Sequence, residues 1–431
     1  MWTRTRLNRC LGSILVLAAT RPSLRSPYSS GAWQSFVVAA ESTRSATSNY
    51  RTLKVQIIHR HGDRSPITPM KDVEYWSSQL IDETTLEKIA ENTNVYREKE
   101  FNHAAGARGP FGKLSKLGLL QMIQVGKTLA EELTEARKDG LFFTPLFDDK
   151  RPLHPSHMQV YSTDFSRTIQ SVQGLLVGLF PDRNPVPITI DVRHTAEMIP
   201  DPIPRRFKEQ EVLETQLVQR PHVLAREKEM LPLAVTATTA LHDLLGKGAH
   251  EVSFGVVQDA TTSIEIEPLQ WNQLAEITVC LASRGLLPAP LTDADKEAIG
   301  AHTAWRWFQT LSHPRLIYLA MHDFVLKQMQ AFGSDAVPLT IWSAHDSTLI
   351  ALLCAYRLQR PAVWPEYASY LVLELVEQIA TQEKFVRFSL NGERLQSQWE
   401  GSPAYDMIPW SVLQDKLNNV GAEPSEFAEL R

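Results

Sequence analysis

Residues 53–66 read LKVQIIHRHGDRSP and decide how the rest of the chain is interpreted. The first six are mostly apolar and predict a buried β-strand. The strand leads at once into a loop that carries the imidazole of His61 between the guanidinium groups of Arg60 and Arg64. Guanidinium groups bind phosphate oxygens in pairs, and an imidazole held among such oxygens can attack phosphorus. The stretch therefore predicts a phosphate site at the end of a strand.

A second motif lies far downstream, where residues 337–343 form another apolar run that predicts a strand. His345 and Asp346 follow it directly. A carboxylic acid beside a bound phosphate ester can protonate the leaving oxygen. Another His-Asp pair, at 322–323, lies inside a helical pattern, so we interpret that pair as ordinary helix residues.

A third cation is expected near the same place. Residues 158–162 predict a short strand, and Thr163 and Asp164 are suitable residues to cap a helix that runs to about 179. Arg167 would lie in the first turn of that helix, where the backbone amides and the helix dipole favour an anion. An ordinary surface arginine is the alternative interpretation.

These motifs together resemble those of the histidine phosphatase superfamily, in its acid-phosphatase branch, branch 2. The resemblance rests on RHGDRSP at 60–66, on the His-Asp pair at 345–346, and on the segments STDFSRT at 162–168 and GKLSKLG at 112–118. It extends from about residue 53 to near the end of the chain. It implies an α/β fold like that of phosphoglycerate mutase, with a mixed central sheet flanked by helices and a smaller helical cap domain.

The same resemblance implies a reaction and a set of roles. His61 would attack phosphorus and form a phosphohistidine, and Asp346 would donate a proton to the leaving oxygen. No metal or other cofactor is expected, because arginines would neutralise the phosphate and the sequence lacks His-Glu-x-x-His and paired Cys-x-x-Cys spacings. Four residues would bind the phosphate group of the substrate: Arg60, Arg64, Arg167 and His345.

Further segments resemble a mitochondrial subgroup of the family whose substrate is lysophosphatidic acid. They are RSPITP at 64–69, VEYW at 73–76, and residues 111–122, 175–180 and 364–375. A lysophosphatidic acid-like lipid would need an apolar groove beside the phosphate. Tyr75, Trp76, Leu80 and the cap helices are candidates to form it, unless they are plain core residues. A broad-specificity acid phosphatase, a phytase-like hydrolase and a catalytically inactive phosphate-binding member remain alternatives. The late His-Asp pair and the long insertion disfavour a phosphoglycerate-mutase-type transferase.

Composition limits the partners. The chain has 431 residues, of which 43% are apolar and 22% charged, as in an ordinary globular protein. A net charge of −5 argues against nucleic acid as a partner, so the expected partner is a small phosphate monoester bound by a local group of arginines. No apolar run is long enough to span a membrane. Of three cysteines, Cys280 and Cys354 are expected to be buried free thiols. The oligomeric state is not predicted.

The expected organisation has four parts. Residues 1–50 form a targeting leader and linker, rich in Arg and Ser and without an acid before Glu41, which is typical of a mitochondrial transit peptide. A secretory or endomembrane signal is the alternative, because residues 11–20 are largely apolar. Residues 51–196 and 326–431 are expected to build the α/β core, with an irregular excursion at 67–112 near the active site. Residues 197–325 form the helical cap.

Local patterns predict several boundaries. Within and after the cap, helices are expected near 207–218, 221–245, 268–284, 293–310 and 315–332. Ser115 is expected to cap a helix, and Ser411 to cap the last one. Residues 370–376 and 384–390 predict an antiparallel pair, followed by a tight turn at Asn391 and Gly392.

Overall fold

The computed structural model describes residues 49–98, 109–135, 137–138, 142–181, 187–249, 267–333, 337–359 and 362–419. The expected leader and linker at 1–50 lie outside them except for the last two residues, which begin the first strand. The described residues all belong to one compact unit, Thr47–Arg431.

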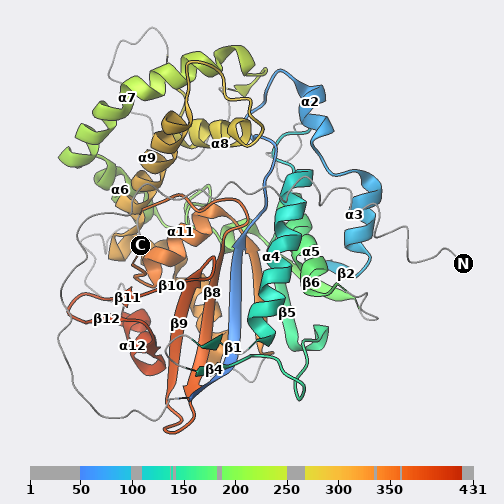
Figure 1. The fold of residues 1–431 in the computed structure, drawn as a ribbon. Helices are drawn as coiled ribbons and strands as arrows, with labels where there is room; N and C mark the ends of the chain where they lie inside the picture. The colour runs from blue at the N-terminus through green and yellow to red at the C-terminus, as the bar shows by residue number, and fades with distance from the viewer. Residues whose placement is uncertain are drawn as a thin grey trace, which may run out of the picture. The chain divides into compact units, whose positions relative to one another are not determined.

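A mixed β-sheet forms the centre of this unit (Figure 1). Its main path runs β10-β9-β8-β1-β7-β5-β6-β2, and β3, β4 and β13 pair at its margins. A separate pair is formed by β11 (Ser397–Gln398) and β12 (Ala404–Tyr405). The strands of the large sheet are β1 (Asn49–Arg60), β2 (Thr93–Arg97), β3 (Arg137–Lys138), β4 (Phe142–Thr144), β5 (Met158–Thr163), β6 (Ile188–Arg193), β7 (Leu339–Ala344), β8 (Tyr370–Gln378), β9 (Lys384–Leu390), β10 (Glu393–Leu395) and β13 (Ile408–Pro409).

The direction of pairing divides the sheet into two halves. β1, β7, β5, β6 and β2 run parallel to their neighbours in this order. β8 and β9 are antiparallel, as the sequence predicts for the 370–376 and 384–390 segments. The turn at Asn391 and Gly392 is also confirmed: both residues have positive φ, 52° and 82°, which suits Asn-Gly.

Helices cover both faces of the sheet and one of its ends. They are α2 (Val73–Ser78), α3 (Glu83–Ala90), α4 (Lys116–Thr134), α5 (Ser166–Leu179), α6 (Lys208–Val218), α7 (Pro221–Leu241), α8 (Trp271–Ala282), α9 (Asp293–Leu311), α10 (Pro314–Gly333), α11 (Asp346–Ala355) and α12 (Trp410–Asn419). None of the helices within the described ranges is long and apolar enough to cross a membrane.

Successive residues of β1 show why the first strand reads as an apolar run. Ile57 packs in a cluster with residues of α4 and α5, including Met122 and Leu175. Ile58 packs in the opposite cluster, with Phe324 of α10 and residues of α11. Both faces of the strand are therefore buried at Ile57 and Ile58, although Lys54 and Gln56 alternate with apolar residues just before them.

The cap helices lie over the end of the sheet at which β1 ends, with α7, α8 and α9 drawn above it in Figure 1. Their own apolar cluster includes Leu274 of α8 and Ile299 of α9. Trp76 of α2 belongs to this cluster and is 2% exposed. Of the two interpretations of Trp76, core packing is therefore the correct one. Helix α10 runs unbroken through residue 325, where the end of the cap is expected from the sequence.

Three expectations about local structure are wrong. The 67–112 excursion is not irregular, because α2, α3 and β2 lie within it, the two helices being capped by Asp72 and Asp82; residues 99–108 lie outside the described ranges. Asp164 does not cap α5; its carboxylate accepts hydrogen bonds from Thr195 instead. The last helix begins at Trp410, so Ser411 lies inside it.

The contact between α4 and α5 depends on two glycines. A Cβ atom at Gly126 would meet the backbone carbonyl of Leu175 and the Cα of Gly178. Backbone atoms cannot move aside as a flexible side chain can, so the two helices would be forced apart. By contrast, Ser115 caps α4 as expected: its hydroxyl oxygen accepts from the Gly118 N–H at 3.0 Å.

We expect Gly126→Ala to lower the free energy of unfolding by about 1–3 kcal/mol through overpacking. Gly300→Ala, in the middle of α9, is the matched control, because nothing lies within 4 Å of its added Cβ. That control should raise stability by about 0.5–1 kcal/mol through helix propensity alone. Urea unfolding curves measure both, and equal effects of the two substitutions would contradict the close approach of α4 and α5.

Candidate active site

Three adjacent parallel strands, β1, β7 and β5, place their carboxyl ends at one edge of the sheet. Loops that follow neighbouring parallel strands meet at such an edge, which is where ligands bind in α/β proteins. Each strand carries one of the motifs found in the sequence. The candidate residues lie at this edge: Arg60, His61 and Arg64 at the end of β1, Arg167 after β5, and His345 and Asp346 after β7.

His61 is buried and held in one orientation. Its Nδ1 lies 2.9 Å from the carbonyl oxygen of Gly62. A carbonyl can only accept, so Nδ1 carries the proton and the neutral ring keeps a lone pair on Nε2. The His345 ring lies 5.7 Å away between centroids, and the Tyr367 ring at the same distance. The arrangement provides a neutral nitrogen nucleophile.

Two of the arginines are paired with carboxylates. Arg60 donates to Asp346 Oδ2 at 2.7 Å and to the Pro365 carbonyl at 2.6 Å. Arg64 donates to Glu276 Oε2 at 2.8 Å. The buried Nε atoms of Arg60, Arg64 and Arg167 have no hydrogen-bond partner among the described residues. Buried donors without partners are costly, and phosphate oxygens would satisfy them.

Arg167 and His345 complete the group. The Arg167 guanidinium stacks 4.1 Å from the Phe165 ring centroid, and the His345 ring meets the same phenyl edge-on. His345 Nε2 lies 3.0 Å from Thr163 Oγ1 at the end of β5. The ring orientation of His345 is therefore set by the neighbouring strand.

The concentration of positive charge shifts the pKa values of the site. Burial, with Arg167 and the other arginines, lowers the pKa of His61 well below its ordinary value. Burial and Arg167 lower the pKa of His345 to about 3. Burial and Arg64 lower the pKa of Arg167 to about 9, which leaves it charged at neutral pH. Both imidazoles are thus neutral in mildly acidic solution.

Asp346 shows the opposite balance. Burial would raise the pKa of its carboxyl, but Arg60 and the neighbouring cations outweigh burial and hold the pKa below its ordinary value. Asp346 is accordingly ionised in the ligand-free site, where it also accepts from the Ser347 N–H at 2.8 Å. It can act as an acid only when a bound anion takes its place on Arg60.

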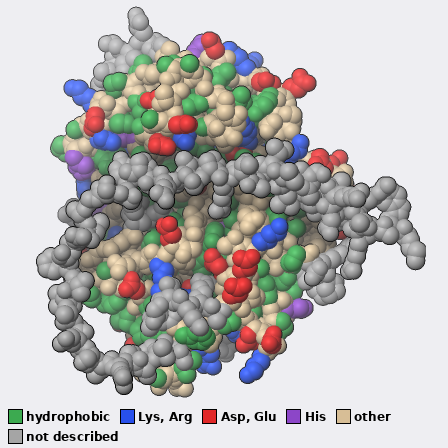
Figure 2. Space-filling view, in the orientation of Figure 1, with side chains coloured by type: hydrophobic (Ala, Val, Ile, Leu, Met, Phe, Trp, Pro, Cys, Tyr) green, Lys and Arg blue, Asp and Glu red, His purple; other side chains and the backbone are tan. Residues whose placement is uncertain are grey.

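The arginine group is a local feature of the protein. On the face shown in Figure 2, acidic and basic side chains of the described residues are interspersed over the surface. This agrees with the small net charge of −5. The attraction for an anion is therefore concentrated at the carboxyl ends of β1, β5 and β7.

Comparison with known proteins shows which family the chain resembles. Residues 53–221, which include Arg60, His61, Arg64 and Arg167, match the model of the histidine phosphatase superfamily (branch 2). The chain is similar to branch 2 of the histidine phosphatase superfamily over these residues. It is a phosphomonoester hydrolase, and the resemblance inferred from the sequence is confirmed.

Curated relatives of the chain match over most of their length. Counting factor 60 of Dictyostelium discoideum is 26% identical, over 82% of this chain and 83% of its own. Lysophosphatidic acid phosphatase type 6 of Homo sapiens is 24% identical, over 79% and 77%. Lysosomal acid phosphatase of Rattus norvegicus is 24% identical, over 75% and 67%.

Solved structures confirm the fold class. The phytase from Citrobacter braakii superposes with a TM-score of 0.56 at 12% identity, over 86% of this chain and 98% of that one. The Hafnia alvei phytase bound to myo-inositol hexakis sulphate also gives 0.56, at 15% identity, over 86% and 97%. At these identities the likeness concerns the mixed α/β architecture alone.

The cap helices and the segment after them supply residues that sequence analysis missed. Glu276 of α8 binds Arg64 and also accepts from the backbone N–H groups of Ile67 and Thr68, at 3.0 and 2.9 Å. Arg284, just beyond α8, binds the Asp63 carboxylate at 2.6 Å. These contacts hold the loop at residues 63–68 against α8 and the residues that follow it. No local pattern marks either residue, because their partners lie more than two hundred residues away in the chain.

Tyr367 is a further residue that the sequence did not single out. Its ring packs under Arg60, with the guanidinium carbon 4.0 Å from the ring centroid, and Arg64 lies 5.9 Å away. Its hydroxyl is 3.4 Å from the Cys280 sulfur. Cys280 and Cys354 are both buried and free, as expected. The Tyr367 ring therefore packs against both Arg60 and Arg64 and helps to position them.

Glu276→Gln should lower the free energy of unfolding by about 3 kcal/mol, because Arg64 would keep its charge without a buried counter-charge. The matched control is Glu229→Gln, whose exposed pair with Arg226 should contribute less than about 0.5 kcal/mol. Urea unfolding of both variants is the measurement. A Glu276 effect as small as that of Glu229 would show that Arg64 does not depend on this ion pair.

A cavity of about 370 Å³ has Asp201 in its lining, and Asp201 lies within electrostatic reach of Asp346. Its wall begins with Pro200 and Asp201, after Met198, whose carbonyl accepts from Thr348 in the first turn of α11. Trp307 of α9 lines it too, and its ring lies 6.1 Å from that of Trp364, next to Pro365. Tyr75, Trp76 and Leu80 do not line this cavity, whereas residues of the cap helices α6 and α9, such as Val218 and Trp307, do.

Proposed function

We propose that this phosphatase hydrolyses its substrate without a metal ion, through a phosphohistidine on His61, and that lysophosphatidic acid-like lipids are its substrates. The observation that carries the reaction route is a neutral His61, with its Nε2 lone pair free for attack, beside Arg60, Arg64 and Arg167. Such a site neutralises a phosphate dianion and presents a nucleophile to it.

The proposed reaction has two steps. The phosphate binds Arg60, Arg64, Arg167 and His345, and takes over the hydrogen bond that Arg60 makes to Asp346. The released carboxyl, now beside an anion, takes up a proton. His61 Nε2 forms a bond to phosphorus as the bond to the ester oxygen breaks, and Asp346 protonates that oxygen. Water, with Asp346 as base, then cleaves the phosphorus–nitrogen bond and releases phosphate.

The pH dependence of kcat/KM tests the electrostatics. Because the pKa of His61 is lowered, its nucleophilic nitrogen stays unprotonated below the usual range of histidine, and activity should persist in acid. In Arg167→Ala, removal of a nearby positive charge raises the pKa of His61, so the acidic limb should move toward neutral pH.

That variant should also lose about 10²-fold in kcat/KM at its optimum, because a phosphate contact is removed. Arg226→Ala, on the exposed surface of α7, is the control and should leave the profile in place. An unchanged acidic limb in Arg167→Ala would contradict the proposed influence of Arg167 on His61.

The lipid part of the proposal rests on the cavity and on the relatives. Its volume lies within the range of small-molecule sites, about 300–1,000 Å³. Most of its lining is apolar, so it suits the glyceryl ester and the beginning of an acyl chain. Two of the relatives named above bear the names of phosphatases, one of lysophosphatidic acid.

The test is phosphate release from p-nitrophenyl phosphate, lysophosphatidic acid and phytate, each with EDTA present. We expect all activity to survive EDTA, with the highest kcat/KM for lysophosphatidic acid. Loss of activity in EDTA would refute the metal-independent route. A preference for phytate, or equal rates on all three, would favour a phytase-like or broad-specificity enzyme and refute the lipid assignment.

We also propose the mitochondrion as the location of the protein. The support is the composition of residues 1–40, which contain five arginines and no acidic residue. Fusing residues 1–50 to a fluorescent protein tests this. Mitochondrial import is expected, and secretion or retention in the endomembrane lumen would establish the alternative.

A further inference from the structure

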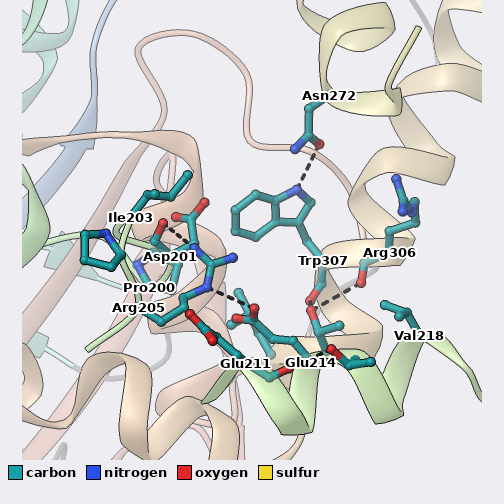
Figure 3. A pocket seen from close by; sticks show the side chains of 14 residues that line it. Pro200, Asp201, Ile203, Arg205, Glu211, Glu214, Val218, Asn272, Arg306 and Trp307 are labelled. Carbon is teal, nitrogen blue, oxygen red and sulfur yellow. Dashed lines mark hydrogen bonds and ion pairs between the residues drawn. The ribbon is translucent and has the colours of Figure 1, made fainter. Parts of the chain in front are cut away.

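Of the carboxylates that line the cavity, that of Asp201 lies within electrostatic reach of Asp346. Asp201 and Trp307 point toward the middle of the cavity from opposite sides of the wall, Asp201 from the loop after β6 and Trp307 from α9 (Figure 3). The surrounding wall is apolar over much of its extent, through Pro200, Ile203, Pro204, Val218 and Leu311. A charged ligand group bound here would therefore contact the Asp201 carboxylate, while the rest of its surroundings would be largely apolar.

The cations of the wall are already engaged. Arg205 donates to Glu214 at 2.9 Å and to the Asp201 backbone carbonyl at 2.8 Å. Arg306 donates to Glu227 at 2.8 Å. The wall contains three carboxylates, those of Asp201, Glu211 and Glu214, against these two guanidiniums. The cavity is therefore suited to a cationic or uncharged group and unsuited to a further anion.

Asp201 also lies within electrostatic reach of the proton donor. Burial, together with the charges of Glu214 and Asp346, raises the pKa of Asp201 to about 6 although Arg205 opposes this. The contact between Met198 and Thr348 independently brings the Asp201 loop to the first turn of α11. Since Asp346 must approach the leaving oxygen, Asp201 is near the carbon atoms next to that oxygen.

We propose that the cavity takes single-chain phosphate monoesters with an ammonium group on the carbon next to the phosphorylated one, and that Asp201 selects them. The substrate class is the 1-phosphates of long-chain 2-amino alcohols. This inference rests on the phosphatase function proposed above and narrows its substrate. The ammonium would pair with Asp201, the chain would lie along Trp307 and the apolar wall, and the phosphate would occupy the arginine site.

The selectivity should depend on pH in a defined direction. The charged groups around Asp201 are Arg205 from its own loop, Glu211 and Glu214 from α6, Arg306 from α9 and Asp346 from α11. Asp201 is largely neutral at pH 5 and ionised above pH 6, whereas an aliphatic ammonium stays charged throughout. Preference for the amino substrate should therefore rise as the pH rises.

The experiment compares two substrates that differ in one group: the 1-phosphate of a 2-amino alcohol and that of the 2-hydroxy compound, with the same chain, short enough to stay monomeric. The readout is the ratio of their kcat/KM values for the full-length protein. In the wild type this ratio should rise several-fold between about pH 5 and about pH 7.5, as Asp201 ionises. In Asp201→Asn it should be about tenfold lower at the higher pH and nearly independent of pH.

The matched control is Asp243→Asn, an exposed carboxylate outside the cavity lining, which should behave like wild type. If Asp201→Asn keeps the wild-type ratio and its pH dependence while both lipids are hydrolysed, the selectivity is refuted and the lipid phosphatase function stands. If the wild type hydrolyses p-nitrophenyl phosphate but neither lipid, the lipid proposal fails and this inference fails with it.

Discussion

Replacing His61 with alanine should lower kcat by about 10⁴-fold or more, the largest effect expected for any single substitution in this protein. The remaining arginines would still bind phosphate, but no other group is placed to accept the phosphoryl. His345 lies beside His61, yet its Nε2 is held by Thr163. Inhibition by inorganic phosphate should therefore survive in the variant while turnover is lost.

His222→Ala, on the exposed side of α7, is the matched control for the loss of an imidazole and should keep full activity. Wild-type enzyme quenched during turnover of a labelled substrate should carry label that acid removes and alkali does not, as expected for phosphorus bound to nitrogen. The His61 variant should carry none. Normal turnover by His61→Ala, or label that is stable in acid, would exclude the phosphohistidine.

Asp346→Asn should produce the second-largest loss, and its size should depend on the leaving group. With an alkyl phosphate the departing alkoxide needs a proton, so kcat/KM should fall by about 10³-fold, within the range of general acid catalysis. With p-nitrophenyl phosphate the departing phenolate is stable without a proton. The loss should therefore be much smaller in the phosphorylation step, which a burst of p-nitrophenol measures.

Asp323→Asn provides a close control, since Asp323 also follows a histidine but lies on an exposed position of α10. It should leave both substrates unaffected. Equal losses on alkyl and aryl phosphates in Asp346→Asn would show that Asp346 serves mainly to hold Arg60, with which it forms a 2.7 Å ion pair, and not to donate a proton.

Much of the local structure could be predicted because its signals are local. The strands β1 and β7 are rich in apolar residues where they are buried, and Ser115 and the Asn391–Gly392 turn have side chains suited to their positions. The excursion at 67–112 was misjudged because its helices are short, so that periodicity has few turns in which to appear. Asp164 was misjudged because its partner, Thr195, comes from another strand end.

For the candidate site too, some residues could be predicted from local sequence and others could not. The sequence by itself determined the candidate reacting groups, since His61, Arg60 and Arg64 are neighbours in one loop and the His-Asp pair follows a recognisable strand. Only the tertiary structure decided which groups surround them. Glu276 reaches Arg64 across 212 residues of chain, and Asp201 reaches the Asp346 side of the site from the loop after β6. Such contacts exist because parallel strands and a cap insertion bring distant segments to one edge of the sheet, and no pattern within a short window records that.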